Sequence, residues 1–119
     1  MGKTDGGRSM VSYLPKKGNF ISLEFDPQTG HEQMGKRPGL VVSNTAFNRK
    51  MGFVFICPIT NTKRKNRFHV PVVSKTLTGY IMVDQLKSLD YRARKAQFIE
   101  ACSEELLQEV LSRIEPILF

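Results

Sequence analysis

Short apolar runs of strand length recur along this chain of 119 residues, and turn-forming residues separate them. The first run, NFISLEF at residues 19–25, alternates two sets of side chains with the period of a half-buried strand. The runs GLVVS (39–43) and GFVFICPI (52–59) are almost continuously apolar and too short for helices, which indicates central strands buried on both faces. Such a pattern favours a strongly bent antiparallel sheet or partly open barrel over a βαβ architecture.

Three later runs extend the mainly β prediction. FHVPVV (68–73) is expected to be an edge or bulged strand, because Pro71 cannot donate a backbone hydrogen bond. TGYIMVDQ (78–85) and AQFIEA (96–101) are expected to be further strands. The segment NTAFNRK (44–50) has no periodicity and is expected to be a loop.

The end of the chain changes to helical spacing. Ser103 is a candidate N-cap, with Glu104 and Glu105 favourably placed in the first turn. The apolar residues that follow with a helical period are Leu106, Leu107, Val110, Leu111 and Ile114. The expected fold is therefore a small antiparallel β-barrel with one C-terminal α-helix.

Length and composition fit one globular domain, with 40% hydrophobic and 24% charged residues. Residues 1–9 (MGKTDGGRS) are interpreted as a flexible leader or expression scar, and residues 10–119 as the domain. No apolar stretch approaches the roughly 20 residues that span a bilayer, so no membrane partner is expected. Two cysteines and two histidines support neither a disulfide scaffold nor a zinc site, and a reduced, cytoplasmic protein is the default.

Positive charge is concentrated in the middle of the chain, within a net charge of +7. Residues 33–83 hold nine Lys and Arg and no Asp or Glu, whereas residues 100–119 hold five Glu against one Arg. A cationic segment attracts an anionic partner, of which nucleic acid is the commonest. The alternative is a solvated basic face.

Three segments offer side chains for chemistry. They contain His31, Glu32, Gln33, Lys36 and Arg37; Thr60, Asn61, Thr62 and Lys63; and Asp84, Gln85, Lys87 and Ser88. Cleavage of RNA without a metal needs a base for the ribose 2′-hydroxyl, an acid for the departing 5′-oxygen, and donors for the phosphorane charge. Carboxylates, an imidazole and an arginine can supply these roles.

Each of these residues also has an ordinary structural explanation. His31 can be a solvated loop histidine, and Glu32 can form a surface ion pair with Arg37 or Lys36. Thr60 can stabilise a turn, and Asp84 can cap the end of a strand. His69 alternates with apolar neighbours and is interpreted as structural.

Several blocks together resemble the MazF/PemK family of toxin ribonucleases. FDP (25–27), TGHEQ (29–33) and KRP (36–38) resemble the start of that family, and LVVS, AFNR, CPIT, VDQLKSLDYRAR and QEVLSRI follow in the family's order. The similarity covers about residues 10–119.

The resemblance implies an SH3-like, PemK-like barrel that acts as a homodimer and binds single-stranded RNA. Members of the family cleave mRNA at short motifs without a metal or other cofactor, leave 2′,3′-cyclic phosphate and 5′-hydroxyl ends, and are neutralised by a small acidic antitoxin of the MazE type. The basic middle segment suits RNA and suits an acidic peptide equally well.

Carried over by position, Arg37, Thr60 and Glu32 are the expected catalytic residues. In the PemK branch, a histidine, an aspartate and an arginine form the proposed triad; the first two match His31 and Asp84, but the third position is Met82. Because Met82 can neither donate a proton nor hold charge, a MazF-like division is favoured, with Arg37 and Thr60 on the phosphate and Glu32 as base or as the group that orients Arg37. The residues expected to bind RNA or support the site are His31, Gln33, Lys36, Lys63, Asp84, Gln85 and Lys87.

Two alternatives stay open at this point. A gyrase-poisoning toxin on a similar fold would use an apolar C-terminal tip, for which Phe119 is a weak signal in a chain without tryptophan. A non-catalytic RNA-binding module would keep the barrel and lose the chemistry, as Met82 permits.

Overall fold

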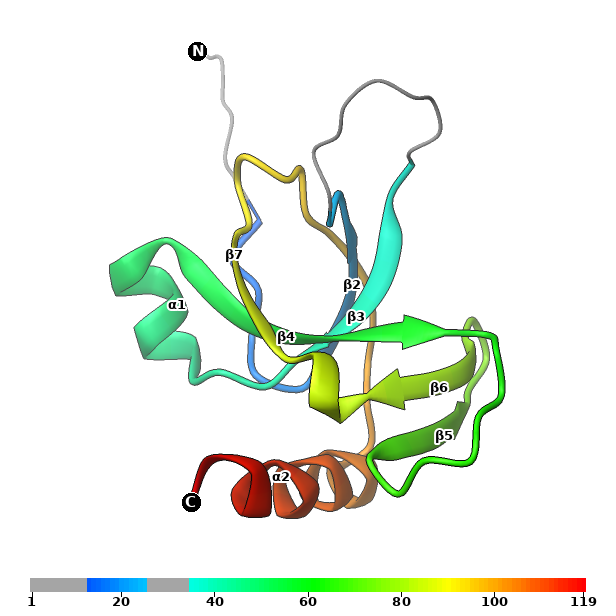
Figure 1. Cartoon of the computed structure of the whole chain (residues 1–119). Coiled ribbons are helices and arrows are strands. Elements are labelled where there is room, and N and C mark those ends of the chain that lie inside the picture. Colours follow the sequence, from blue (N-terminus) through cyan, green and yellow to red (C-terminus); the bar gives the residue numbers. More distant parts are fainter. Residues whose placement is uncertain (1–12, 26–34) are drawn as a thin grey trace, which may run out of the picture.

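A curled antiparallel sheet forms the body of the molecule (Figure 1). The computed structural model describes residues 13–25 and 35–119. The strands are β2 (Asn19–Leu23), β3 (Arg37–Val41), β4 (Phe53–Thr60), β5 (His69–Val73), β6 (Thr78–Met82), β7 (Lys87–Asp90) and β8 (Gln97–Ala101). Every pairing is antiparallel, and the order along the sheet is β5-β6-β4-β3-β2-β8, with β7 joined to β4. The prediction of a bent antiparallel sheet is confirmed.

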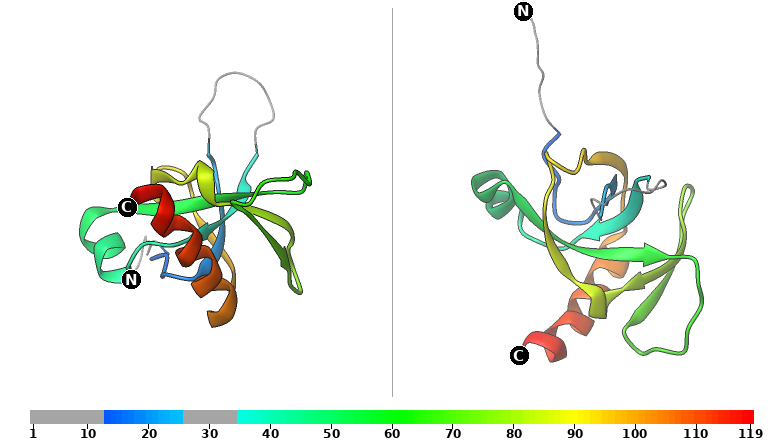
Figure 2. Two further views of the ribbon diagram at one scale, coloured as in Figure 1. Left: turned by 60° about the horizontal axis from the view of Figure 1, so that its bottom comes forward. Right: turned by 45° about the horizontal axis from the view of Figure 1, so that its top comes forward.

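The long strand β4 makes the sheet curl. Its first half pairs with β7 and its second half pairs with β6, while β3 lies along its other edge. The sheet therefore folds around β4, as the views in Figure 2 show. Strand β5 lies at the end of the order, so the prediction of an edge position for the strand that contains Pro71 is confirmed.

Apolar side chains are buried on both faces of the sheet. Phe20 and Leu40 belong to the cluster beneath the C-terminal helix, whereas their neighbours Ile21 and Val41 belong to a second cluster on the opposite face. Because successive side chains of a strand point to opposite faces, continuous apolar runs supply both clusters. The prediction of central strands buried on both sides is confirmed for the end of β3 and the second half of β4, whereas Phe53 and Phe55 are exposed in its first half. The prediction of a half-buried strand at residues 19–25 is wrong, because β2 is buried on both faces.

Helix α2 (Glu104–Leu118) covers one face of the sheet (Figure 2). The Ser103 hydroxyl accepts a hydrogen bond from the backbone N–H of Leu106 at 3.1 Å, as predicted for its N-cap. Leu107, Val110 and Ile114 are buried against the sheet. In the part of the chain that the structure describes, no helix is long and apolar enough to cross a membrane.

The prediction of a loop at residues 44–50 is wrong, because helix α1 (Thr45–Met51) lies there. The Asn44 side chain accepts hydrogen bonds from the backbone N–H groups of Ala46 and Phe47, which caps the first turn. Gly52 ends the helix in the left-handed conformation with φ 75°. The helix is too short to show a hydrophobic period, but its two caps are readable in the sequence.

The predicted strand at residues 78–85 ends early, at Met82. A single 3₁₀ turn, η1 (Val83–Gln85), follows it and redirects the chain toward β7. Strand β7 was not predicted, since Leu89 is its only buried residue and no apolar run marks it. Residues 87–90 form a strand because they pair with β4, although their own sequence shows no strand pattern.

One buried polar residue ties the helix α1 to its surroundings. Asn48 is completely buried, and its amide nitrogen donates to the Pro15 carbonyl at 2.9 Å. Its amide oxygen accepts from the Ser43 hydroxyl at 2.5 Å, and its backbone carbonyl accepts from the Tyr91 hydroxyl at 3.0 Å. Three separate segments are therefore fastened through one side chain and its backbone.

Candidate active site

Arg37 opens strand β3 and Thr60 closes strand β4, and the sheet brings them together. The two strands pair Gly39 with Pro58 and Leu40 with Cys57. Continuing the same antiparallel register by two residues leads to Arg37 on one strand and Thr60 on the other. Strand pairing thus places two polar side chains, distant in the sequence, at one end of the sheet.

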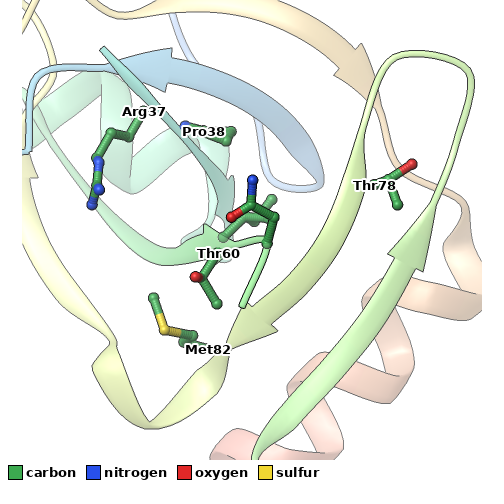
Figure 3. A pocket seen from close by; sticks show the side chains of 7 residues that line it. Arg37, Pro38, Thr60, Thr78 and Met82 are labelled. Atoms are coloured by element: carbon green, nitrogen blue, oxygen red, sulfur yellow. The ribbon is translucent and has the colours of Figure 1, made fainter. Parts of the chain in front are cut away.

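These two residues line a cleft of about 240 Å³. Its walls are formed by Arg37, Pro38, Ile59, Thr60, Asn61, Thr78 and Met82. Figure 3 shows the side chains of Arg37, Thr60 and Met82 around the same space, with Thr78 on its far side. The cleft therefore combines a guanidinium and hydroxyl groups with an apolar wall.

The hydroxyl of Thr60 is oriented by the chain that follows it. Its oxygen accepts a hydrogen bond from the backbone N–H of Thr62 at 3.1 Å. A hydroxyl that already accepts keeps its own proton available to donate. Together with the five N–H donors of the exposed Arg37, Thr60 can hold an oxyanion such as a phosphate.

Met82 ends strand β6 opposite His69 of strand β5 and reaches the cleft with a thioether. It adds apolar surface and a weak acceptor, and it supplies neither a proton nor a positive charge.

Asp84 lies beside the cleft-forming strands rather than in the cleft wall. One carboxylate oxygen is 3.4 Å from Nε2 of His69, and the other accepts from the Asn66 side-chain amide at 3.4 Å. The His69 side chain is only 6% exposed, and its Nδ1 has no hydrogen-bond partner among the described residues. Burial, together with the smaller effect of the negative charge of Asp84, raises the pKa of the nearby Cys57 thiol to about 12.

Four other predicted residues are described, and none of them lines the cleft. Lys36 and Gln85 are exposed, and Lys63 is exposed in the connection between β4 and β5. Lys87 begins β7 and holds its Nζ 5.7 Å from the centre of the Phe25 ring. Lys36 directly precedes Arg37 in the chain, whereas Lys87 pairs with Ile56 in the middle of β4.

The predicted residues His31, Glu32 and Gln33 lie outside the described residues, so their roles stay predictions. Thr78 lines the cleft and was not predicted; it reaches this place because β6 pairs with the end of β4, and its own sequence context carries no signal. Among residues 13–25 and 35–119, no group of three or more His, Cys, Asp or Glu side chains could hold a metal ion.

Comparison with known proteins places this fold and cleft in one class. The family described as PemK-like, MazF-like toxin of type II toxin–antitoxin system matches residues 16–118. The endoribonuclease toxin MazF of Escherichia coli K12 is 34% identical over 110 residues, which cover 92% of this chain and 99% of that protein. The endoribonuclease toxin ChpB of the same organism is 35% identical over 108 residues, covering 86% of this chain and 92% of that one.

Solved structures agree with the sequence comparison. The crystal structure of MazE–MazF from Deinococcus radiodurans superposes with a TM-score of 0.83 at 34% identity, covering 90% of this chain and 97% of that chain. A crystal structure of MazF from the same organism gives a TM-score of 0.80. The chain belongs to the PemK-like, MazF-like toxin family, and the prediction made from its motifs is confirmed.

Proposed function

We propose that this chain, an endoribonuclease toxin of the MazF/PemK type, cleaves single-stranded mRNA at short sequence motifs without a metal ion or other cofactor. The observation that carries the proposal is the meeting of Arg37 and Thr60 in one cleft. Their arrangement suits a phosphodiester, because a guanidinium and a hydroxyl can both donate to phosphate oxygens.

In the proposed reaction the ribose 2′-oxygen attacks the adjacent phosphorus and the 5′-oxygen leaves. Glu32 takes the 2′-hydroxyl proton or orients Arg37, and a proton passes to the departing 5′-oxygen. Arg37 and Thr60 stabilise the negative charge that gathers on the phosphorane. The products are a 2′,3′-cyclic phosphate and a 5′-hydroxyl end.

The surroundings of Asp84 support a MazF-like division of roles. Its carboxylate is engaged by His69 and Asn66, and Met82 stands where the PemK branch has its arginine. Asp84 therefore supports the site and is not the base. The residues that bind RNA or support the site in this proposal are His31, Gln33, Lys36, Lys63, Asp84, Gln85 and Lys87.

The proposed partners are a second copy of the chain and a cognate acidic antitoxin in the cytoplasm. Large apolar side chains are exposed on α1 and β4, where the rings of Phe47 and Phe55 lie 5.7 Å apart. Exposed apolar surface of this kind is typical of protein–protein interfaces, which supports a homodimer. MazE–MazF structures of relatives support a MazE-like antitoxin, and the cationic middle of this chain suits an acidic one.

The decisive experiment incubates the purified protein with a long single-stranded RNA in EDTA and maps the ends of the fragments. We expect cuts at a short motif with 5′-hydroxyl ends. Arg37→Ala and Thr60→Val should each lower kcat by about 100-fold or more, because each removes a donor to the transition state. RNA that stays intact although the protein binds it would contradict the nuclease proposal and support a non-catalytic RNA-binding module.

Arg49→Ala is the matched control for Arg37→Ala. Arg49 is an exposed arginine in α1, outside the cleft. Its variant should cut at the wild-type rate, so that equal losses in both variants would assign the effect to net charge. Cleavage that EDTA abolishes would contradict the metal-independent reaction.

A further inference from the structure

The turn between β7 and β8 carries two exposed cations, Arg92 and Lys95. Asp90 closes it, because its carboxylate accepts from the backbone N–H groups of Arg92 and Ala93, both at 3.0 Å. Lys95 has a left-handed backbone with φ 57°, which costs a residue other than glycine about 1–2 kcal/mol. The side chains of Arg92 and Lys95 are both exposed on this turn.

An aromatic wall faces these cations across a second cleft, of about 200 Å³. The cleft is lined by Tyr13, Tyr91, Arg92, Lys95 and Ala96. The Tyr91 hydroxyl donates to the Asn48 carbonyl, and the Tyr13 hydroxyl donates to the Asn19 side chain. Tyr91 is only 3% exposed, so the partly exposed Tyr13 supplies most of the ring surface and the two cations supply the charge.

Phe98 adds an exposed ring at the edge of this cleft. It is 53% exposed although it belongs to strand β8, and its ring packs edge-on against Tyr13 with 6.1 Å between centroids. An aromatic ring fixed by a second ring keeps a face free for stacking. Rings beside cations are the common means of binding single-stranded nucleic acid.

The turn leads into strand β8, whose first residue Gln97 pairs with β2 next to the end that lies opposite Arg37. Strand register sets Arg37 opposite Leu23, and Gln97 opposite Ser22. The Lys36 ammonium group donates to the Gln97 side chain at 2.7 Å across the end of β2. An RNA strand that leaves the cleft at Arg37 would pass Lys36 first and the β7–β8 turn next.

We propose that Arg92, Lys95 and Phe98 form a second RNA-binding surface, which holds single-stranded RNA outside the cleavage cleft. Phosphates contact the two cations, and a base stacks on Phe98. The ammonium group of Lys95 lies 3.8 Å from the Glu24 carboxylate, and such an exposed pair is readily exchanged for a phosphate. Charge alone would serve an acidic peptide equally well, but an exposed ring beside the charge favours RNA. The proposal rests on the proposed function, since it assigns a second contact surface to the same RNA substrate.

The test measures binding of a fluorescein-labelled single-stranded RNA of about 15 nucleotides, 2′-O-methylated so that it is not cut, by fluorescence anisotropy. Arg92→Gln/Lys95→Gln should weaken binding and lower the slope of log Kd against log salt by about 1.4, since each phosphate contact contributes about 0.7. Phe98→Ala should weaken binding by about 5- to 100-fold through lost stacking. Arg49→Gln/Lys50→Gln removes the same charge from helix α1 and should bind normally.

Three results would overturn the proposal. Wild-type affinity in both Arg92→Gln/Lys95→Gln and Phe98→Ala would show that the surface does not bind RNA. An equal loss of affinity in the helix α1 control would show that the effect comes from net charge. Normal RNA binding by Phe98→Ala, together with weaker binding of poly-L-glutamate by the double variant, would assign the turn to an acidic peptide.

Cleavage of a long RNA by the same proteins separates this proposal from the proposed function. If the wild-type protein binds the methylated RNA but cuts no RNA, the nuclease proposal fails and the proposed second RNA-binding surface is unaffected. A wild-type protein that cuts RNA, with turn variants that bind it normally, overturns the surface alone. Circular dichroism of each variant establishes that it is folded.

Discussion

Replacing Gly79 with alanine should damage the cleft between Arg37 and Thr60 without substituting any residue in its wall. A Cβ at position 79 would lie 2.6 Å from the backbone oxygen of Thr60 and 3.1 Å from Cγ2 of Ile59. The first distance is about 0.8 Å short of ordinary van der Waals contact, so the end of β4 has to retreat by a similar amount. A misplacement of about 1 Å in a catalytic group costs up to about 100-fold in rate, and we expect kcat to fall by about 10- to 100-fold in Gly79→Ala.

The same overpacking should lower the free energy of unfolding by about 1–3 kcal/mol, measured by urea denaturation. Gly35→Ala is the matched control, because a Cβ there meets nothing within 4 Å and should change neither quantity. Steady-state cleavage of an RNA with the mapped motif gives kcat for both variants. A Gly79→Ala protein that loses stability but keeps its wild-type kcat would refute the view that the position of Thr60 governs cleavage.

Three further predictions follow from buried or hydrogen-bonded groups. Burial raises the pKa of Cys57 to about 12 and that of Cys102 to about 11, so iodoacetamide at pH 8 should alkylate both far more slowly than an unfolded cysteine, as read by mass spectrometry. Hydrogen bonds from Thr76 lower the pKa of Glu100 below its ordinary 4.5; this stabilisation is present above that value and is lost as the pH falls through the lowered pKa. Wild type should therefore exceed Glu100→Gln in unfolding free energy at pH 7, and the difference should vanish in acid. Asn48→Ala leaves buried partners without hydrogen bonds and should cost about 2–4 kcal/mol in urea unfolding.

The accuracy of the sequence predictions followed the strength of each local signal. Strands β2, β3 and β4 and helix α2 were predicted because burial on one or both faces imposes a visible period. Helix α1 was missed because seven residues are too few to show a period, although Asn44 and Gly52 mark its two ends. Strand β7 exposes three of its four residues, and only its pairing with β4 makes it a strand.

The candidate site shows the same division between local and non-local information. Arg37 and Thr60 were predicted through family motifs, and no property of their own segments implies that they meet. Their proximity follows from the register of β3 against β4, which depends on how the whole apolar pattern packs. Thr78 reaches the cleft for the same reason and had no motif to mark it.

Met82 and Asp84 support the proposed MazF-like mechanism over a PemK-like one. A PemK-like mechanism needs a free carboxylate and a proton donor at these two places. Here the carboxylate of Asp84 is engaged by the buried His69, and Met82 offers only a thioether. If Asp84 acts only through this contact, Asp84→Asn should keep most of kcat and lose stability, whereas Arg37→Ala should lose kcat and keep stability. A large loss of kcat with normal stability in Asp84→Asn would instead indicate that Asp84 takes part in the chemical step. Cleavage assays and urea unfolding of the two variants decide between these outcomes.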